Sequence, residues 1–160
     1  YIPMGGLIVS DKVFDVIKTA GDFNHGFTYS GHPVAAAVAL ENIRILRDEK
    51  IIETVREETS PYLQKRLREL LDHPLVGEVR GVGMLGAIEL VKDKATRARY
   101  EGKGAGMICR GHCFNNGLIM RAVGDTMIIS PPLVISKAEI DELVTKARLC
   151  LDLTLKDLQG

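Results

Sequence analysis

Hydrophobic residues recur at helical spacing in five parts of the chain. Val13, Phe14 and Ile17 share one helical face between Ser10, a residue type that caps helices, and Gly21, which is expected to end the helix. The same spacing recurs further along. The sequence predicts helices over residues 11–19, from residue 33 onward, and over residues 52–71, 105–115 and 136–156.

Several residues indicate where these helices begin, bend or end. Pro33 stands where a helix tolerates proline best, in its first turn. Pro61 falls inside a helical pattern and predicts a kink or a restart there. Gly117 follows the fourth helix and is expected to end it, whereas Ser136 and Glu139 have the spacing of a capping box for the last one.

Short apolar runs bounded by turn residues predict strands between the helices. Leu7–Val9 is long enough only for a buried strand. The other predicted strands are Val76–Val82, Leu85–Val91, Leu118–Met120 and Met127–Ile129. The order of elements predicts an α/β remnant followed by a small α+β domain, and we expect the boundary near residue 60, with domains at 1–60 and 61–160.

Residues 81–86 spell GVGMLG, the glycine pattern of dinucleotide-binding proteins, and Glu101 lies at about the offset that the pattern expects. That pattern needs a helix opening at its last glycine. Here Gly86 begins a run, GAIELV, that is typical of a strand. We therefore expect a tight turn between two strands at this position and no nicotinamide site.

Composition and charge exclude several classes of protein. The chain is 46% apolar and has no run of eighteen apolar residues, so we expect a globular protein without a membrane span. Lysine and arginine number 21, as do aspartate and glutamate, and neither sign forms a block. Without a basic face, nucleic acid is not an expected partner.

The three cysteines are an odd number in a chain without a secretory signal, which favours reduced thiols and a cytoplasmic location. Cys109 and Cys113 are four residues apart on one helical face, with His112 between them. No second pair completes a four-ligand set for a metal. We therefore interpret these cysteines as buried apolar residues.

Residues 25–33 form a polar loop, HGFTYSGHP, that leads directly into an alanine-rich helix start. Thr28, Tyr29 and Ser30 offer three hydroxyls beside helical amides that lack partners, which is an arrangement suited to a small anion. An ordinary capping turn has the same composition, and residue chemistry alone leaves both readings open. The helix start from Pro33 is apolar all round and needs cover, most simply from another subunit.

Three motifs stand out along the chain: Tyr1–Gly6, residues 25–33 and Arg121–Asp125. Together they resemble the class III, fold type I, pyridoxal phosphate aminotransferases, especially their omega-amine or diamine:pyruvate branch. They occur in the same order as in that family, and the resemblance covers essentially the whole chain. It implies that the fold is the last part of the large coenzyme-binding domain followed by the small C-terminal domain.

The resemblance implies roles for three residues. Thr28 matches the threonine that binds the phosphate of pyridoxal 5'-phosphate, and Phe27 contributes its backbone amide. In the family these two residues come from the neighbouring subunit, so the resemblance implies a homodimer, or a tetramer built from it, with shared active sites. Arg121 matches the mobile arginine that binds the substrate carboxylate and swings aside for amines.

The resemblance also places the Schiff-base lysine just before the residues that match Tyr1–Gly5, and no lysine here stands in that context. The chain begins at Tyr1 without an initiator methionine, which we interpret as a C-terminal fragment that is inactive alone. No residue of the chain is therefore predicted to be catalytic. His25 and His32 are expected to be structural.

The implied function is transfer of an amino group from an amine or diamine to pyruvate. Two alternatives stay open. One is an aminotransferase of the ornithine or 4-aminobutyrate type. The other is that the piece is a non-catalytic dimerisation module.

Overall fold

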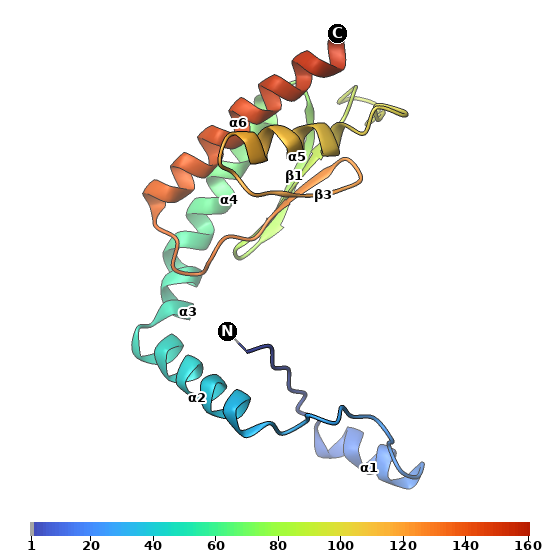
Figure 1. The fold of residues 1–160 in the computed structure, drawn as a ribbon, viewed down its shortest axis with the longest axis vertical. Coiled ribbons are helices and arrows are strands. Elements are labelled where there is room, and N and C mark those ends of the chain that lie inside the picture. Colours follow the sequence, from blue (N-terminus) through green and yellow to red (C-terminus); the bar gives the residue numbers. More distant parts are fainter. Residues whose placement is uncertain (1) are drawn as a thin grey trace. The chain divides into compact units, whose positions relative to one another are not determined.

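The computed structural model describes residues 2–160, and their contacts divide the chain into two compact units. The N-terminal unit is Tyr1–Lys50 and the C-terminal unit is Ile51–Gly160. The expected domain division at residue 60 concerns the complete protein and stays a prediction. Figure 1 draws both units and labels several of their helices and strands.

The N-terminal unit contains two helices, α1 (Asp11–Thr19) and α2 (Pro33–Asp48), and both were predicted. Gly21, with a φ of 101°, follows the first helix, and Pro33 lies in the first turn of the second. The predicted strand at Leu7–Val9 is wrong. No strand among residues 2–160 pairs with it, and Ile8 is 99% exposed, so its backbone lacks the hydrogen-bond partners that a strand requires.

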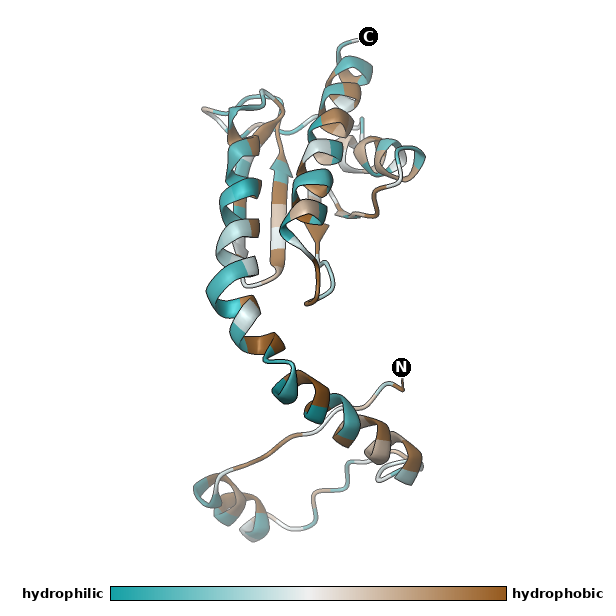
Figure 2. Ribbon diagram, turned by 90° about the vertical axis from the view of Figure 1, so that its left-hand side faces the viewer, coloured by the Kyte–Doolittle hydropathy of each residue, from teal (hydrophilic) through white to brown (hydrophobic). Residues whose placement is uncertain are grey.

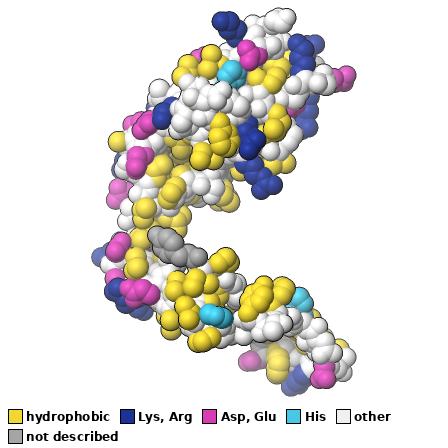
Figure 3. Space-filling view, viewed as in Figure 1, with side chains coloured by type: hydrophobic (Ala, Val, Ile, Leu, Met, Phe, Trp, Pro, Cys, Tyr) yellow, Lys and Arg dark blue, Asp and Glu magenta, His cyan; other side chains and the backbone are white. Residues whose placement is uncertain are grey.

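Hydrophobic residues of the N-terminal unit are almost all at its surface. Ala35 is the only buried residue among residues 2–50. Figure 3 shows hydrophobic side chains gathered over much of the visible face of this unit. The large exposed ones are Ile2, Met4, Leu7, Ile8, Val9, Val13, Phe14, Val16, Phe23, Phe27, Tyr29, Val34, Leu40 and Ile43.

The C-terminal unit is a four-stranded antiparallel sheet with helices packed on one face. Its elements are α3 (Ile51–Thr54), the π-helical turn η1 (Val55–Thr59), α4 (Ser60–Arg68), the 3₁₀ turn η2 (Glu69–Asp72), β1 (Val76–Val82), β2 (Leu85–Leu90), α5 (Ala105–Asn115), β3 (Arg121–Val123), β4 (Thr126–Ile129) and α6 (Lys137–Gln159). The strand order is β1-β2-β4-β3, which makes β3 an edge strand.

Most predicted elements of the C-terminal unit are confirmed, and one is displaced. Helix α5 has the predicted bounds, and the capping box of Ser136 and Glu139 is present at α6. The strand predicted at Leu118–Met120 lies three residues later, at β3. Leu118 and Met120 are buried, but no strand in the described part of the chain pairs with their backbone; pairing begins where Arg121 faces Ile128 of β4.

The expected irregularity at Pro61 takes the form of the π-helical turn η1, immediately before α4. Proline has no amide hydrogen, and its ring would collide with the carbonyl four residues earlier in a regular helix. A π turn opens the backbone at that point. The helical run therefore continues across Pro61 and does not stop.

The GVGMLG stretch is a hairpin turn, as expected from the sequence. Strand β1 ends at Val82, Gly83 has a φ of 59°, and β2 begins at Leu85. A Cβ atom at Gly86 would lie 2.5 Å from Leu67 Cδ1, so this glycine lets α4 pack closely on the sheet. No helix opens at the last glycine, which removes the geometry that a dinucleotide needs.

The core of the C-terminal unit lies between the sheet and helices α4, α5 and α6. Figure 2 shows hydropathy changing around α4 and α6, with hydrophilic and hydrophobic stretches on each helix. Leu63, Leu67 and Leu70 are fully buried under the sheet, which presents Ile88 and Met127 to them. The alternate residues of the strands point away from this core.

The three cysteines are buried, as interpreted from the sequence, and all are free thiols. Cys109 and Cys113 on α5 lie near Cys150 on α6. The neighbouring Cys109 thiol, and then burial, raise the pKa of the Cys113 thiol. Among residues 2–160 no group of three or more His, Cys, Asp or Glu side chains is arranged to hold a metal.

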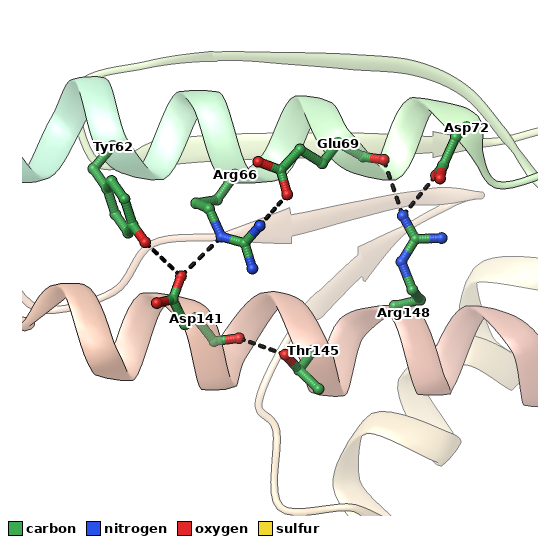
Figure 4. Close-up of polar contacts among 7 residues, drawn as sticks. All are labelled: Tyr62, Arg66, Glu69, Asp72, Asp141, Thr145 and Arg148. Atoms are coloured by element: carbon green, nitrogen blue, oxygen red, sulfur yellow. Dashed lines mark hydrogen bonds and ion pairs between the residues drawn. The ribbon is translucent and has the colours of Figure 1, made fainter.

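A polar seam joins α4 to α6 (Figure 4). Asp141 accepts hydrogen bonds from the Tyr62 hydroxyl at 2.7 Å and from Arg66 Nε at 2.8 Å. The Tyr62 hydrogen bond, and then Arg66, lower the pKa of Asp141. At the other end of the seam Arg148 donates to Asp72 at 2.6 Å. The seam fixes the alignment of the two helices along the edge of the core.

Candidate functional site

The loop before α2 is organised by local hydrogen bonds. Phe27 N donates to Ser30 Oγ at 3.1 Å, and Ser30 N donates to Phe27 O at 2.9 Å, so residues 27–30 form a closed turn. His32 is the N-cap of α2, and its Nδ1 accepts a hydrogen bond from Ala35 N at 3.2 Å. As expected, His32 binds local backbone.

This loop and the N-terminal stretch line a pocket of about 1130 Å³ within the N-terminal unit. Phe27, Tyr29, Ser30 and His32 contribute to its wall, and so does the stretch Ile2–Leu7. The rings of Phe27 and Tyr29 stack with centroids 5.7 Å apart. Thr28 does not line this pocket. Two of the three motifs quoted above therefore meet around one hollow.

The Thr28 hydroxyl makes no hydrogen bond within the described part of the chain, and the residue is exposed. The residues around it suit a phosphate. A free hydroxyl can donate to a phosphate oxygen, and the Phe27 amide now donates to a neutral serine hydroxyl, an acceptor that a phosphate oxygen outcompetes. The loop thus presents the free Thr28 hydroxyl next to the Phe27 amide, and the binding of a coenzyme phosphate by these two groups stays a prediction.

Arg121 lies on the open face of the sheet in the C-terminal unit. It faces Ile128 on β4, which faces Ala87 on β2, which faces Arg80 on β1. Because side chains of directly paired residues lie on the same side of a sheet, these four residues form one row across the open face. Arg121 is exposed and lies at the β3 end of that row.

The other arginines on or above this open face are paired with carboxylates. Glu89 accepts hydrogen bonds from Arg80 at 2.8 Å and from Arg99 at 3.2 Å, and Arg97 donates to Glu78 at 3.1 Å. Arg121 makes no ion pair and no side-chain hydrogen bond among residues 2–160. Its guanidinium is therefore available to a carboxylate from outside the unit, and a bidentate grip is the geometry that arginine favours.

The structure supplies one feature that sequence reasoning missed. Asp125, in the turn between β3 and β4, accepts a hydrogen bond from Gly106 N of α5 at 3.0 Å. A Gly-Asp turn and a helix start at residue 105 were both predicted, but nothing in the sequence shows that they touch. Phe27 and Thr28 belong to the N-terminal unit and Arg121 to the C-terminal unit.

A family match, related sequences and solved structures all relate this chain to aminotransferases. The family description "Aminotransferase class-III" matches residues 2–151. The chain is 72% identical over 154 residues to the putrescine–pyruvate aminotransferase of Pseudomonas aeruginosa, which covers 96% of this chain and 34% of that protein. It is 42% identical over 149 residues to gamma aminobutyrate transaminase 1, mitochondrial, of Solanum lycopersicum, covering 90% of this chain and 29% of that one.

Solved structures give the same answer. A thermostable omega transaminase mutant from Pseudomonas jessenii superposes with a TM-score of 0.81 at 38% identity, covering 92% of this chain and 33% of that one. A transaminase with L-alanine gives a TM-score of 0.81 at 42% identity, covering 92% of this chain and 35% of that one. The chain spans about a third of the length of the curated relatives it matches. It belongs to the class III aminotransferases, a family that depends on pyridoxal phosphate.

Proposed function

We propose that the complete protein carrying this chain transfers an amino group from an amine or diamine, with putrescine as the first candidate, to pyruvate. The 72% identity to a putrescine–pyruvate aminotransferase carries this proposal. The identity to gamma aminobutyrate transaminases is much lower, at 42%. When bound, pyridoxal phosphate would supply an aldehyde carbon that takes up the amino group and a ring that withdraws electrons from it.

In this proposal Thr28 and Phe27 hold the coenzyme phosphate through the hydroxyl and the backbone amide. Arg121 binds the carboxylate of pyruvate or of the alanine produced from it. A diamine carries no carboxylate, so its binding does not use this guanidinium. The unpaired state of Arg121 supports its role, because the other arginines of the open sheet face are already neutralised by Glu78 and Glu89.

The same proposal includes a second copy of the chain. Helix α2 directly follows the loop that carries Phe27 and Thr28. It exposes Val34, Leu40 and Ile43, which are 54%, 70% and 57% accessible. An apolar helix next to the loop fits a homodimer in which Phe27 and Thr28 serve the partner's site. We propose the cytoplasm as its location. Among the residues described, none of the helices has the length and apolar character needed to span a bilayer.

The substrate role of Arg121 is tested by steady-state kinetics on the complete protein loaded with pyridoxal phosphate. Arg121→Ala is expected to raise the KM for pyruvate by about 100-fold, since a charge-assisted bidentate contact is lost, and to leave the KM for putrescine within about twofold. Arg97→Ala, which removes another exposed arginine, serves as the control. Equal changes in both KM values would contradict the role.

The sharing of sites between subunits is tested by mixing two variants, each with reduced activity. Thr28→Val is expected to weaken coenzyme binding, and Arg121→Ala to weaken pyruvate binding. If Thr28 serves the partner's site, a mixed dimer contains one site with both wild-type residues, and activity returns after subunit exchange. If both residues serve their own subunit, each site keeps one defect and the mixture stays as weak as its components.

A donor panel separates the proposed reaction from its alternatives. Putrescine, 4-aminobutyrate and ornithine are compared with pyruvate as acceptor, and kcat/KM is expected to be highest for putrescine. A preference for 4-aminobutyrate would favour that branch of the family. Failure of the complete protein to transaminate any of the three would support the dimerisation module instead.

A further inference from the structure

The hairpin that carries Arg121 is fastened at its turn by Asp125. Strand β3 has three residues and, among residues 2–160, pairs with β4 alone, so hydrogen bonds to a neighbouring strand hold it on one side. Val123 pairs with Thr126, which leaves Gly124 and Asp125 as a two-residue turn, and Gly124 has a φ of 56°, as the first position of such turns requires. Before the strand, Met120 is buried and anchors the chain.

Asp125 connects this turn to two other elements. Its carboxylate Oδ1 accepts the hydrogen bond from Gly106 N at 3.0 Å, and its backbone carbonyl accepts one from Leu90 N, at the end of β2, at 2.9 Å. Gly106 lies in the first turn of α5, where backbone amides have no partner within the helix and where a negative charge is favourable. One residue therefore ties the hairpin to the neighbouring strand and to a helix.

The helix and the turn are in direct backbone contact. A Cβ atom at Gly106 would lie 2.1 Å from Gly124 O, so only glycine allows α5 to approach the turn this closely. Helix α5 is itself fixed, since Cys109 and Cys113 are buried in the core beside α6. The position of the turn is thus set by a rigid helix.

We propose that Asp125 is a positioning residue for Arg121, and that its contact with the amide end of α5 sets where the guanidinium meets the substrate carboxylate. This inference rests on the proposed role of Arg121. The strand between the two residues is extended and short, so a displacement of the turn shifts the edge strand as a unit. A misplacement of about 1 Å in a binding group is enough to cost one to two orders of magnitude in efficiency.

The test compares KM values for pyruvate and putrescine in the complete protein loaded with pyridoxal phosphate. Asp125→Ala is expected to raise the KM for pyruvate about tenfold and to leave the KM for putrescine within about twofold. Asp125→Asn keeps an oxygen that can accept from Gly106 N, and it is expected to stay close to wild type. A purely structural role would change both KM values together, or only the melting temperature.

A second variant approaches the same contact from the helix. Gly106→Ala places a methyl group against Gly124 O and is expected to show the same selective rise. Gly111→Ala in the same helix is the matched control, because a Cβ atom there meets nothing within 4 Å. If either Asp125→Ala or Gly106→Ala fails to fold, as judged by its melting curve and coenzyme absorbance, the KM values of the folded variant test the positioning role.

The outcomes separate the two proposals. If Arg121→Ala itself shows no difference between the substrates, the proposed function of Arg121 fails. If Arg121→Ala is selective but the folded Asp125→Ala and Gly106→Ala variants are not, only the positioning role is overturned. It is also overturned if Asp125→Asn behaves like Asp125→Ala, because the contact requires an acceptor and not a charge.

Discussion

Both units of this chain are rich in hydrophobic residues, but only the C-terminal unit buries them. Its core includes Leu63, Leu67 and Leu70 at 0% exposure, whereas residues 2–50 contain a single buried residue, Ala35. Since burial of apolar surface is the main favourable term in folding, the C-terminal unit has its own source of stability. The N-terminal unit has apolar side chains without a core, so its order depends on what covers them.

The largest difference between the two units is expected when each is produced as a separate polypeptide and its folding is measured. A polypeptide of residues 51–160 is expected to fold cooperatively by itself, and one of residues 1–50 is expected to remain unfolded. Circular dichroism melts and the dispersion of amide resonances measure both. A cooperative melt of the 1–50 polypeptide alone would contradict the view that only the C-terminal unit has its own source of stability.

Two substitutions of leucine by alanine, one in each unit, compare the stability that a buried and an exposed side chain contribute. Leu67→Ala removes a fully buried side chain that packs against Gly86, and it is expected to lower the unfolding free energy by about 2–5 kcal/mol. Leu40→Ala on α2, where the side chain is 70% exposed, is expected to change it by less than about 0.5 kcal/mol in this chain alone. Denaturant unfolding of both variants checks the difference.

In the complete protein the Leu40→Ala variant also tests whether a second copy of the chain covers α2. If a second copy covers α2, Leu40→Ala is expected to weaken self-association in sedimentation experiments while leaving the C-terminal unit unchanged. Unchanged self-association would mean that something other than a second copy covers this part of the helix.

The smallest expected effect concerns acid stability of the C-terminal unit. The hydrogen bond from Arg80, and then that from Arg99, lower the pKa of Glu89 from its ordinary value of 4.5. A carboxyl whose pKa is lowered in the folded state stabilises fully above its unfolded pKa, and that contribution is lost as the pH falls from about 4.5 through the folded pKa. Glu89→Gln is therefore expected to cost up to about 1 kcal/mol at neutral pH and nothing at the acid end of this window.

Glu53→Gln is the matched control, because Glu53 is exposed and makes no ion pair in the described part of the chain. Urea unfolding of both variants at neutral pH and below pH 4 measures the effect. A Glu89 variant whose deficit persists undiminished in acid would show that the loss arises from packing and not from charge.

The sequence predicted helix ends and turns best where residues close together in the chain determine them. The Ser136–Glu139 capping box, Gly83 and Gly117 act on their immediate neighbours, and the helices and turns they mark are present. The strand predicted at Leu118–Met120 was displaced because a short apolar run shows that side chains are buried, not which backbone groups find a partner. For Leu7–Val9 the prediction of burial was itself wrong, since Leu7 and Ile8 are exposed in this chain.

The candidate site was predictable only in part. The roles of Thr28 and Arg121 came from resemblance, since hydroxyls in a loop and an arginine after an apolar run fit many surfaces. Residue chemistry could not show that Arg80 is neutralised and Arg121 is not, because that depends on pairing across the sheet. The contacts of Asp125 with Gly106, and of Tyr62 with Asp141, join residues far apart in sequence and have no local signature.

The π-helical turn before Pro61 also has a consequence for how this helical run tolerates changes in length. Such a turn holds one more residue than an α-helical turn, and each residue rotates a helix by about 100°. The extra residue therefore sets how α3 is rotated relative to α4, whose Leu63 and Leu67 are buried in the core. Deleting one residue from 55–59 would leave these leucines in the core and would turn the residues before the turn by about 100°, so they would present a different face to their surroundings.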